Sequence, residues 1–185
     1  MAFDYGKGID ITGTKLFDLI KFYVFMCPVE NQSKASTQNG KTLAQLGIKR
    51  DALKRLLARM KEESDESGIF HFAKNNEDIV QTFDVYCNST TGDVIAINPS
   101  DCSQAGSIFL LIRCAFAHGA FQIEKRTEQD FVYYFEKRNK KDTVNALARI
   151  HEETLIKWIS LFDKKELRKL ISGKPDKKKN RRVKK

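Results

Sequence analysis

Arg113 and His118 are the residues whose types and spacing are best suited to chemistry on a phosphate. They interrupt the otherwise apolar segment LIRCAFAHGAF, residues 111–121. An arginine stays charged and binds phosphate through two parallel hydrogen bonds, whereas a histidine exchanges a proton near neutral pH. Together they can bind the phosphate charge and transfer a proton, which is the minimum that cutting a phosphodiester bond requires.

The spacing of this pair constrains how both side chains can reach one ligand. On an α-helix, five residues correspond to a rise of about 7.5 Å and leave the side chains about 140° apart. A long arginine side chain, together with a helix that frays at Gly119, would bring both to the same cleft. Spacing alone leaves a structural alternative open, in which the histidine is a satisfied core residue and the arginine pairs with a carboxylate.

The segment IRCAFAHG, residues 112–119, resembles the R-x4-6-H motif of the HEPN domain family, with four residues between Arg113 and His118. The resemblance is concentrated in residues 106–120. It implies a metal-independent endoribonuclease that acts as a homodimer without a cofactor, with His118 as acid or base at the RNA 2′-hydroxyl and Arg113 stabilising the phosphate. It also implies a role as a toxin or anti-phage defence effector, with an antitoxin or regulatory protein as partner. Cys114 departs from the polar residue that often follows the arginine, and a thiol is a poor hydrogen-bond donor.

The positive charge of the chain is concentrated at its C-terminal end. The net charge is +9, and residues 174–185, KPDKKKNRRVKK, contain eight Lys or Arg residues and one Asp. We therefore predict a single domain over residues 1–173 and a disordered basic tail over 174–185. The tail is either a solvated terminus or an electrostatic anchor for nucleic acid. As an anchor, it would bind through its basic side chains, among them Lys177, Lys178, Lys179, Arg181 and Arg182.

The pattern along the chain predicts a predominantly α fold, a HEPN-like helical bundle with one or two inserted β-hairpins. Helices are expected over residues 14–26, 104–118 and 143–172 from the spacing of their apolar residues. Residues 79–97 predict a hairpin that turns at Gly92, and residues 120–141 predict a second. The helix over 104–118 has N-cap candidates in Ser100, Asp101 and Ser103.

For the homodimer, Phe109, Ile112 and Phe116 are expected to supply the apolar interface, and the two-fold axis would place a second His118 beside the first. His71 is interpreted as a packing residue among aromatics and His151 as a surface residue beside Glu152. Neither is assigned to catalysis.

Other functional classes have weaker support in the sequence. Residues 42–60 allow a DNA-reading helix-turn-helix or an ordinary amphipathic helical hairpin, although Ala44 and Gly47 are three residues apart where that motif usually has four. None of the four cysteines forms a CxxC pair or has a histidine at ligand spacing, so no metal site is expected. Without an apolar stretch of membrane-spanning length or a signal peptide, the expected location is the cytoplasm. The alternative to a ribonuclease is a non-catalytic nucleic-acid-binding or regulatory module.

Overall fold

The protein is a mixed α/β structure in the computed structural model, which describes residues 11–30, 42–64, 67–99 and 102–173. The predominantly α bundle predicted from the sequence is therefore wrong, because five strands form one mixed sheet. The helical elements are α1 (Leu16–Ile20) with its π-helical continuation η1 (Lys21–Met26), α2 (Asp51–Glu63), α3 (Ile79–Ser89), α4 (Gln104–His118), α5 (Glu152–Ser160) and α6 (Lys164–Ser172). The strands are β1 (Ile69–Phe72), β2 (Val94–Ile97), β3 (Phe121–Lys125), β4 (Phe131–Arg138) and β5 (Val144–His151).

The sheet has the strand order β1-β2-β5-β4-β3. β1 and β2 are parallel and are joined through α3, as a parallel pair requires a crossover. The other three pairs are antiparallel, and β4 and β5 share the longest ladder, from Val132 opposite His151 to Arg138 opposite Val144. Because β4 and β5 are paired over this length, residues at the two ends of the ladder lie at fixed positions relative to one another.

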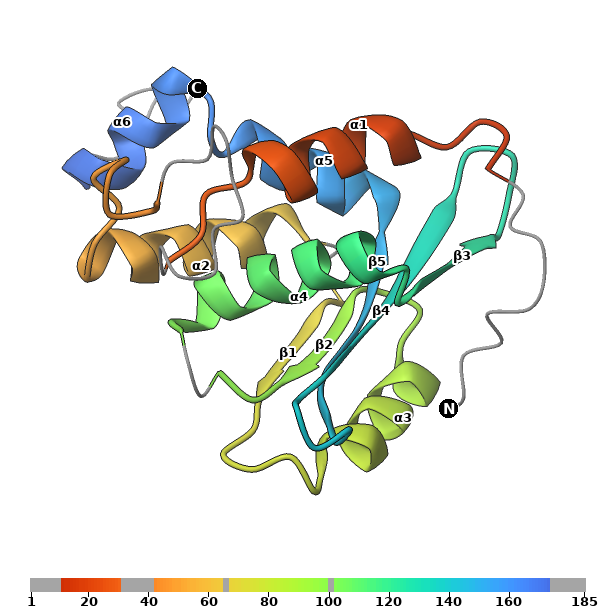
Figure 1. Cartoon of the computed structure of the whole chain (residues 1–185). Coiled ribbons are helices and arrows are strands. Elements are labelled where there is room, and N and C mark those ends of the chain that lie inside the picture. The colour runs from red at the N-terminus through yellow and green to blue at the C-terminus, as the bar shows by residue number, and fades with distance from the viewer. Residues whose placement is uncertain (1–10, 31–41, 65–66, 100–101, 174–185) are drawn as a thin grey trace, which may run out of the picture.

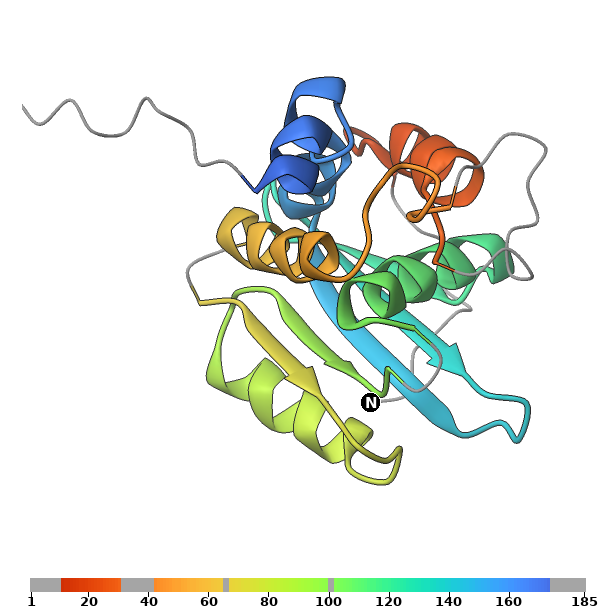
Figure 2. The same cartoon turned by 90° about the vertical axis from the view of Figure 1, so that its left-hand side faces the viewer.

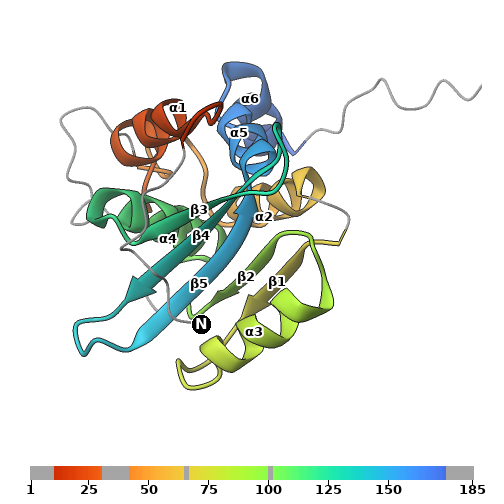
Figure 3. The same cartoon turned by 90° about the vertical axis from the view of Figure 1, so that its right-hand side faces the viewer.

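Helices cover both faces of this sheet. α3 lies alone on one face, while α1, α2, α4, α5 and α6 lie on the other (Figure 1). The turned views show the same two layers, with α3 and α4 separated by the strands (Figure 2, Figure 3). The larger core lies under α4 and includes Phe109, Trp158 and Tyr133, and the smaller one lies under α3 around Phe83.

The second half of the sequence contains the largest error of prediction. Residues 143–172 were expected to form one helix, but residues 144–151 form β5 and the helices follow it. Within β5, Ala146, Ala148 and Ile150 belong to the larger core and Leu147 to the smaller one. This alternation has the two-residue period of a strand, and Asn145, Arg149 and His151 occupy the same alternate positions as Leu147.

The hairpin predicted over residues 79–97 is also wrong in its first half. Residues 79–89 form α3, which buries Ile79 and Phe83 and packs Tyr86 and Cys87 against the smaller core. These positions recur at helical spacing, but the β-branched residues between them favoured a strand in the sequence analysis. β2 is a strand as expected, although its partners are β1 and β5.

The elements next to the candidate motif agree with prediction. α4 ends at His118 as expected, and its N-cap is Ser103, whose hydroxyl accepts a hydrogen bond from the Gly106 N–H at 3.1 Å. β3 and β4 form the predicted second hairpin. The two N-cap candidates at positions 100 and 101 lie outside the described residues.

The helix-turn-helix considered for residues 42–60 is not formed. Residues 43–47 make a turn, and the one helix of this stretch is α2, which buries Ala52, Leu56 and Met60. α2 packs on α4, α5 and α6. No helix in the described ranges is long and apolar enough to cross a membrane.

Candidate functional site

A cleft of about 720 Å³ lies between the C-terminal half of α4 and the turn that joins β4 to β5. The helix contributes residues three or four apart, which places them along one side of an α-helix. The strands contribute five consecutive residues of the turn region and one residue of β5. The lining residues are Leu110, Arg113, Cys114, Ala117, His118, Lys137, Arg138, Asn139, Lys140, Lys141 and Asn145.

Arg113 and His118 therefore line the same cleft, although they differ strongly in exposure. Arg113 is 5% exposed, whereas His118 is exposed at the last position of the helix. The helix does not fray there, because Gly119 adopts a left-handed conformation with φ 70° and its N–H is bonded to the Ala115 carbonyl. A glycine accepts this conformation without the steric cost of a side chain. The cap thus fixes the backbone beside His118.

Arg113 also acts on the inner side of the helix. Burial raises the pKa of the Cys27 thiol, and the charge of Arg113 works in the opposite direction. Cys27 directly follows η1, which packs against α4. The Arg113 guanidinium therefore lies between the larger core, which includes Cys27, and the basic cleft.

Among the residues lining this cleft, every charged side chain is basic. Besides Arg113 they are Lys137, Arg138, Lys140 and Lys141, and the lining includes no aspartate or glutamate. An anionic ligand is favoured in such a cleft, because cations on low-dielectric walls raise the local concentration of anions. The sequence signal for the second wall is the run KRNKK at 137–141, which the sequence analysis did not single out. The predicted binding residues Lys177, Lys178, Lys179, Arg181 and Arg182 lie outside the described residues.

The other two histidines occupy different environments. His71 lies in β1, half-buried, with its ring centroid 5.9 Å from that of Tyr86, which fits the packing role expected for it. The expectation that His151 lies on a helix surface is wrong. His151 is the last residue of β5, and its side chain is 18% exposed.

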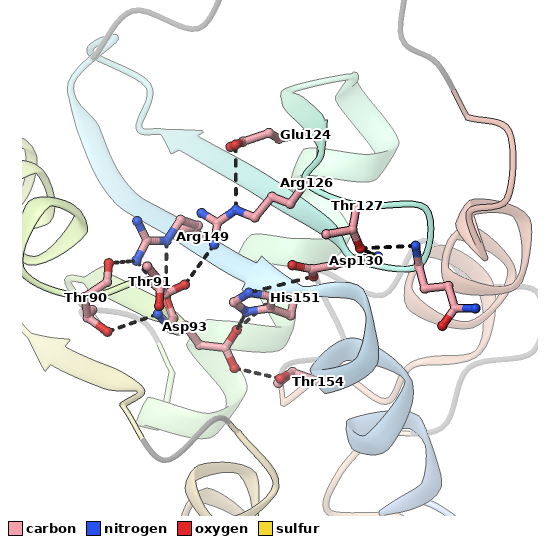
Figure 4. A network of polar contacts seen from close by, with 12 residues as sticks. Thr90, Thr91, Asp93, Glu124, Arg126, Thr127, Asp130, Arg149, His151 and Thr154 are labelled. Carbon is pink, nitrogen blue, oxygen red and sulfur yellow. Dashed lines mark hydrogen bonds and ion pairs between the residues drawn. The ribbon is translucent and has the colours of Figure 1, made fainter.

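A polar network surrounds His151 at the opposite end of β5 from the basic cleft (Figure 4). The Asp93 carboxylate is fully buried and accepts hydrogen bonds from the His151 backbone N–H at 2.8 Å and the Thr154 hydroxyl at 2.7 Å. It also lies 2.9 Å from His151 Nδ1. The side chain of Arg149, itself buried, donates to the carbonyls of Cys87, Thr90 and Gly92. These contacts join the segment before β2 to the junction of β5 and α5.

The electrostatics of this network favour a protonated His151. The hydrogen bond to Asp93 raises the pKa of His151, burial opposes this effect, and the charges of Asp93 and Asp130 add to it. With Nδ1 held by Asp93, Nε2 is the nitrogen that lies toward Asp130, at 4.0 Å. A second cleft of about 660 Å³ adjoins it, lined by both acidic and basic side chains. Its mixed charge gives it no preference for a polyanion.

The three apolar residues expected to supply the dimer interface are buried inside a single chain. Phe109, Ile112 and Phe116 are 1%, 0% and 7% exposed within a single chain. Phe116 packs edge-on against Phe121 and Phe135 at centroid distances of 5.0 and 5.2 Å. The prediction that these three residues are available to a second subunit is therefore wrong, while the homodimer itself stays a prediction.

No group of three or more metal-ligating side chains is found in the part of the chain that the structure describes. The side chains of the basic cleft that can take part in chemistry are its arginine, histidine, lysine and thiol groups. Comparison with known proteins found no matching family model, no matching curated protein and no matching solved structure.

Proposed function

We propose that this protein binds RNA in the basic cleft and cuts its phosphodiester backbone there without a metal ion, with Arg113 and His118 as the reacting residues. The observation that carries the proposal is that both residues line one cleft whose charged lining is entirely basic. The proposal rests on these residues and not on a fold, because the helical bundle implied by the motif is absent. The roles as toxin or defence effector and the antitoxin partner remain predictions from the motif alone.

The reaction uses the RNA 2′-hydroxyl as its nucleophile. The 2′-oxygen forms a bond to phosphorus and the bond from phosphorus to the 5′-oxygen breaks, which leaves a 2′,3′-cyclic phosphate and a 5′-hydroxyl. His118 accepts the 2′ proton as the base, and the leaving 5′-oxygen takes a proton from the acid that the predicted homodimer would supply, a second copy of His118. Arg113 binds the non-bridging oxygens, where negative charge builds up. A positioned acid or base of this kind contributes a rate factor of about 10² to 10⁴.

The test is incubation of the purified full-length protein with end-labelled RNA in EDTA, with wild type compared with His118→Ala. We expect fragments with cyclic phosphate ends from wild type and at least a 100-fold slower rate from the variant, the lower limit of the factor given above. His71→Ala is the matched control, because it removes a histidine from β1, outside the residues that line the cleft. Equal loss in both variants, or a His118→Ala protein that still cuts at the wild-type rate, would refute the role of His118.

A non-catalytic RNA-binding protein is the second candidate, and the burial of Arg113 favours it. A guanidinium that is 5% exposed and acts on Cys27 also has a structural role. Cys114, half-buried beside it, offers only a weak hydrogen-bond donor. RNA binding by wild type with no fragments in the same assay would select this candidate, and absence of both binding and fragments would reject the cleft as an RNA site.

A further inference from the structure

The turn between β4 and β5 is held in one conformation by its own hydrogen bonds. The side-chain oxygen of Asn139 accepts hydrogen bonds from the backbone N–H groups of Lys141 at 2.8 Å and Thr143 at 3.1 Å. The Asn139 backbone N–H also donates to the Thr143 carbonyl at 2.9 Å. Asp142 adopts φ 58°, a left-handed conformation that aspartate tolerates better than most residues. Lys140 and Lys141 are therefore presented from a fixed backbone.

The four basic side chains of this turn fall into two groups. Arg138 is engaged within the turn: its guanidinium pairs with Glu136 and donates to the Asp142 carbonyl at 3.1 Å. Lys137, Lys140 and Lys141 have no carboxylate partner among the residues that the structure describes, and the last two are exposed. Arg138 thus stabilises the turn, whereas the three lysines keep their full charge for a ligand.

The chemistry of the cleft lining decides what kind of contact these lysines make. A lysine ammonium acts as a flexible point charge that binds phosphate oxygens, without the planar fork of an arginine. No Phe, Tyr or Trp side chain lines the cleft, and these are the large aromatic platforms on which single-strand sites stack bases. The contact that the lysines offer is with the phosphate backbone, which carries no direct sequence information.

We infer that the β4–β5 turn is a backbone-binding subsite that holds RNA phosphates next to the bond cut at Arg113 and His118, through Lys137, Lys140 and Lys141. The inference rests on the proposed function for its RNA ligand. It defines the substrate class as an RNA chain with phosphates on at least one side of the scissile bond, of any base sequence. A dinucleotide has one internucleotide phosphate, so with that phosphate at His118 none is left for the turn lysines.

The size of the effect follows from counterion release. For single strands the logarithm of the binding constant falls with the logarithm of salt concentration by about 0.7 per phosphate contacted, so losing three contacts reduces that slope by about 2. The loss of affinity is then greatest at low salt and shrinks as salt is added.

The experiment compares two triple variants in a His118→Ala background, so that the RNA stays intact. One is Lys137→Gln/Lys140→Gln/Lys141→Gln, and the control is Lys49→Gln/Lys164→Gln/Lys165→Gln, which removes the same charge from exposed positions that do not line the cleft. Binding of a fluorescent RNA of about twelve nucleotides, a length that single-strand sites cover, is measured over a range of salt concentrations. We expect the slope to fall by about 2 in the first variant and by less than 1 in the control.

Two further measurements distinguish phosphate binding by the turn from effects of the substitutions on folding and on catalysis. The double variant Lys140→Gln/Lys141→Gln, at two exposed positions, should keep the wild-type melting temperature. Its salt slope should fall by about two thirds of the decrease expected for the triple variant. In the cleavage-competent protein, the turn variant should slow the cutting of the longer RNA by a larger factor than the cutting of a dinucleotide. Equal slopes in the turn variant and the control would overturn the subsite and leave the proposed function standing. If wild type binds RNA without cutting it, catalysis fails, while the binding experiment still decides the subsite.

Discussion

Replacement of Asp93 by alanine should remove a large part of the stability of this protein. The carboxylate is 0% exposed and receives hydrogen bonds from the His151 backbone, the His151 ring and the Thr154 hydroxyl. Asp93→Ala leaves these donors without their acceptor in a site that little water can reach. The substitution acts on the β5–α5 junction and on its attachment to β2, far from the residues that line the basic cleft.

The magnitude can be bounded in two ways. A hydrogen bond to a charged group contributes about 1.5–3 kcal/mol, and breaking a buried ion pair by removing one partner costs about 3–5 kcal/mol. The three contacts share one carboxylate and are not additive. We therefore expect a loss of about 3–5 kcal/mol, which for a chain of this length corresponds to a fall in Tm of about 6–20 °C.

The assay is urea unfolding at neutral pH, followed by circular dichroism, with Asp130→Ala as matched control. Asp130 belongs to the same network, but its side chain is 40% exposed and lies 4.0 Å from His151. An exposed pair of this kind contributes about 0–1 kcal/mol, so the control should lose little. A loss below about 1 kcal/mol for Asp93→Ala, or an equal loss in both variants, would refute the view that Asp93 holds the junction together.

Two further predictions concern protonation and assembly. The pKa of His151 is raised above its ordinary value of 6.5, so its stabilising effect should be complete below that pH and lost as pH rises through the folded-state pKa. The difference in unfolding free energy between wild type and His151→Gln should therefore shrink as pH rises above about 6.5, the value in the unfolded chain, and a constant difference would contradict it. The active species should be a homodimer, because strand scission needs an acid and a base and one cleft holds one histidine. Light scattering should then give about twice the 21.2 kDa chain mass, and a fully active monomer would exclude a shared site.

The sequence predicts the elements around the motif well because each has one dominant signal. α4 has an N-cap serine at Ser103 and a glycine at Gly119, and the hairpin of β3 and β4 has aromatic strands. β5 was mistaken for helix because Leu147 and Ile150 also fit the helical spacing of the apolar residues that follow, among them Leu155 and Trp158. The polar residues Asn145, Arg149 and His151 do recur at the two-residue period of a strand. α3 was mistaken for a strand because local β-propensity was weighed above the helical spacing of Ile79 and Phe83.

The two walls of the candidate site differ in how well the sequence predicts them. Arg113 and His118 are close in sequence, so helix geometry could bring them to one cleft, whereas the second wall depends on how β4 and β5 pack against α4. The pairing of Asp93 with His151 joins residues 58 positions apart. No local pattern encodes such a contact, and His151 was therefore interpreted from its neighbours in the chain alone.

The β4–β5 turn projects from the sheet beyond the helices that cover it (Figure 2). Its conformation is set by bonds among its own residues, from Asn139 to Thr143, while both cores are built from other positions. Substitutions at Lys140 and Lys141 can therefore change the charge that the turn offers to a ligand without altering a residue of either core.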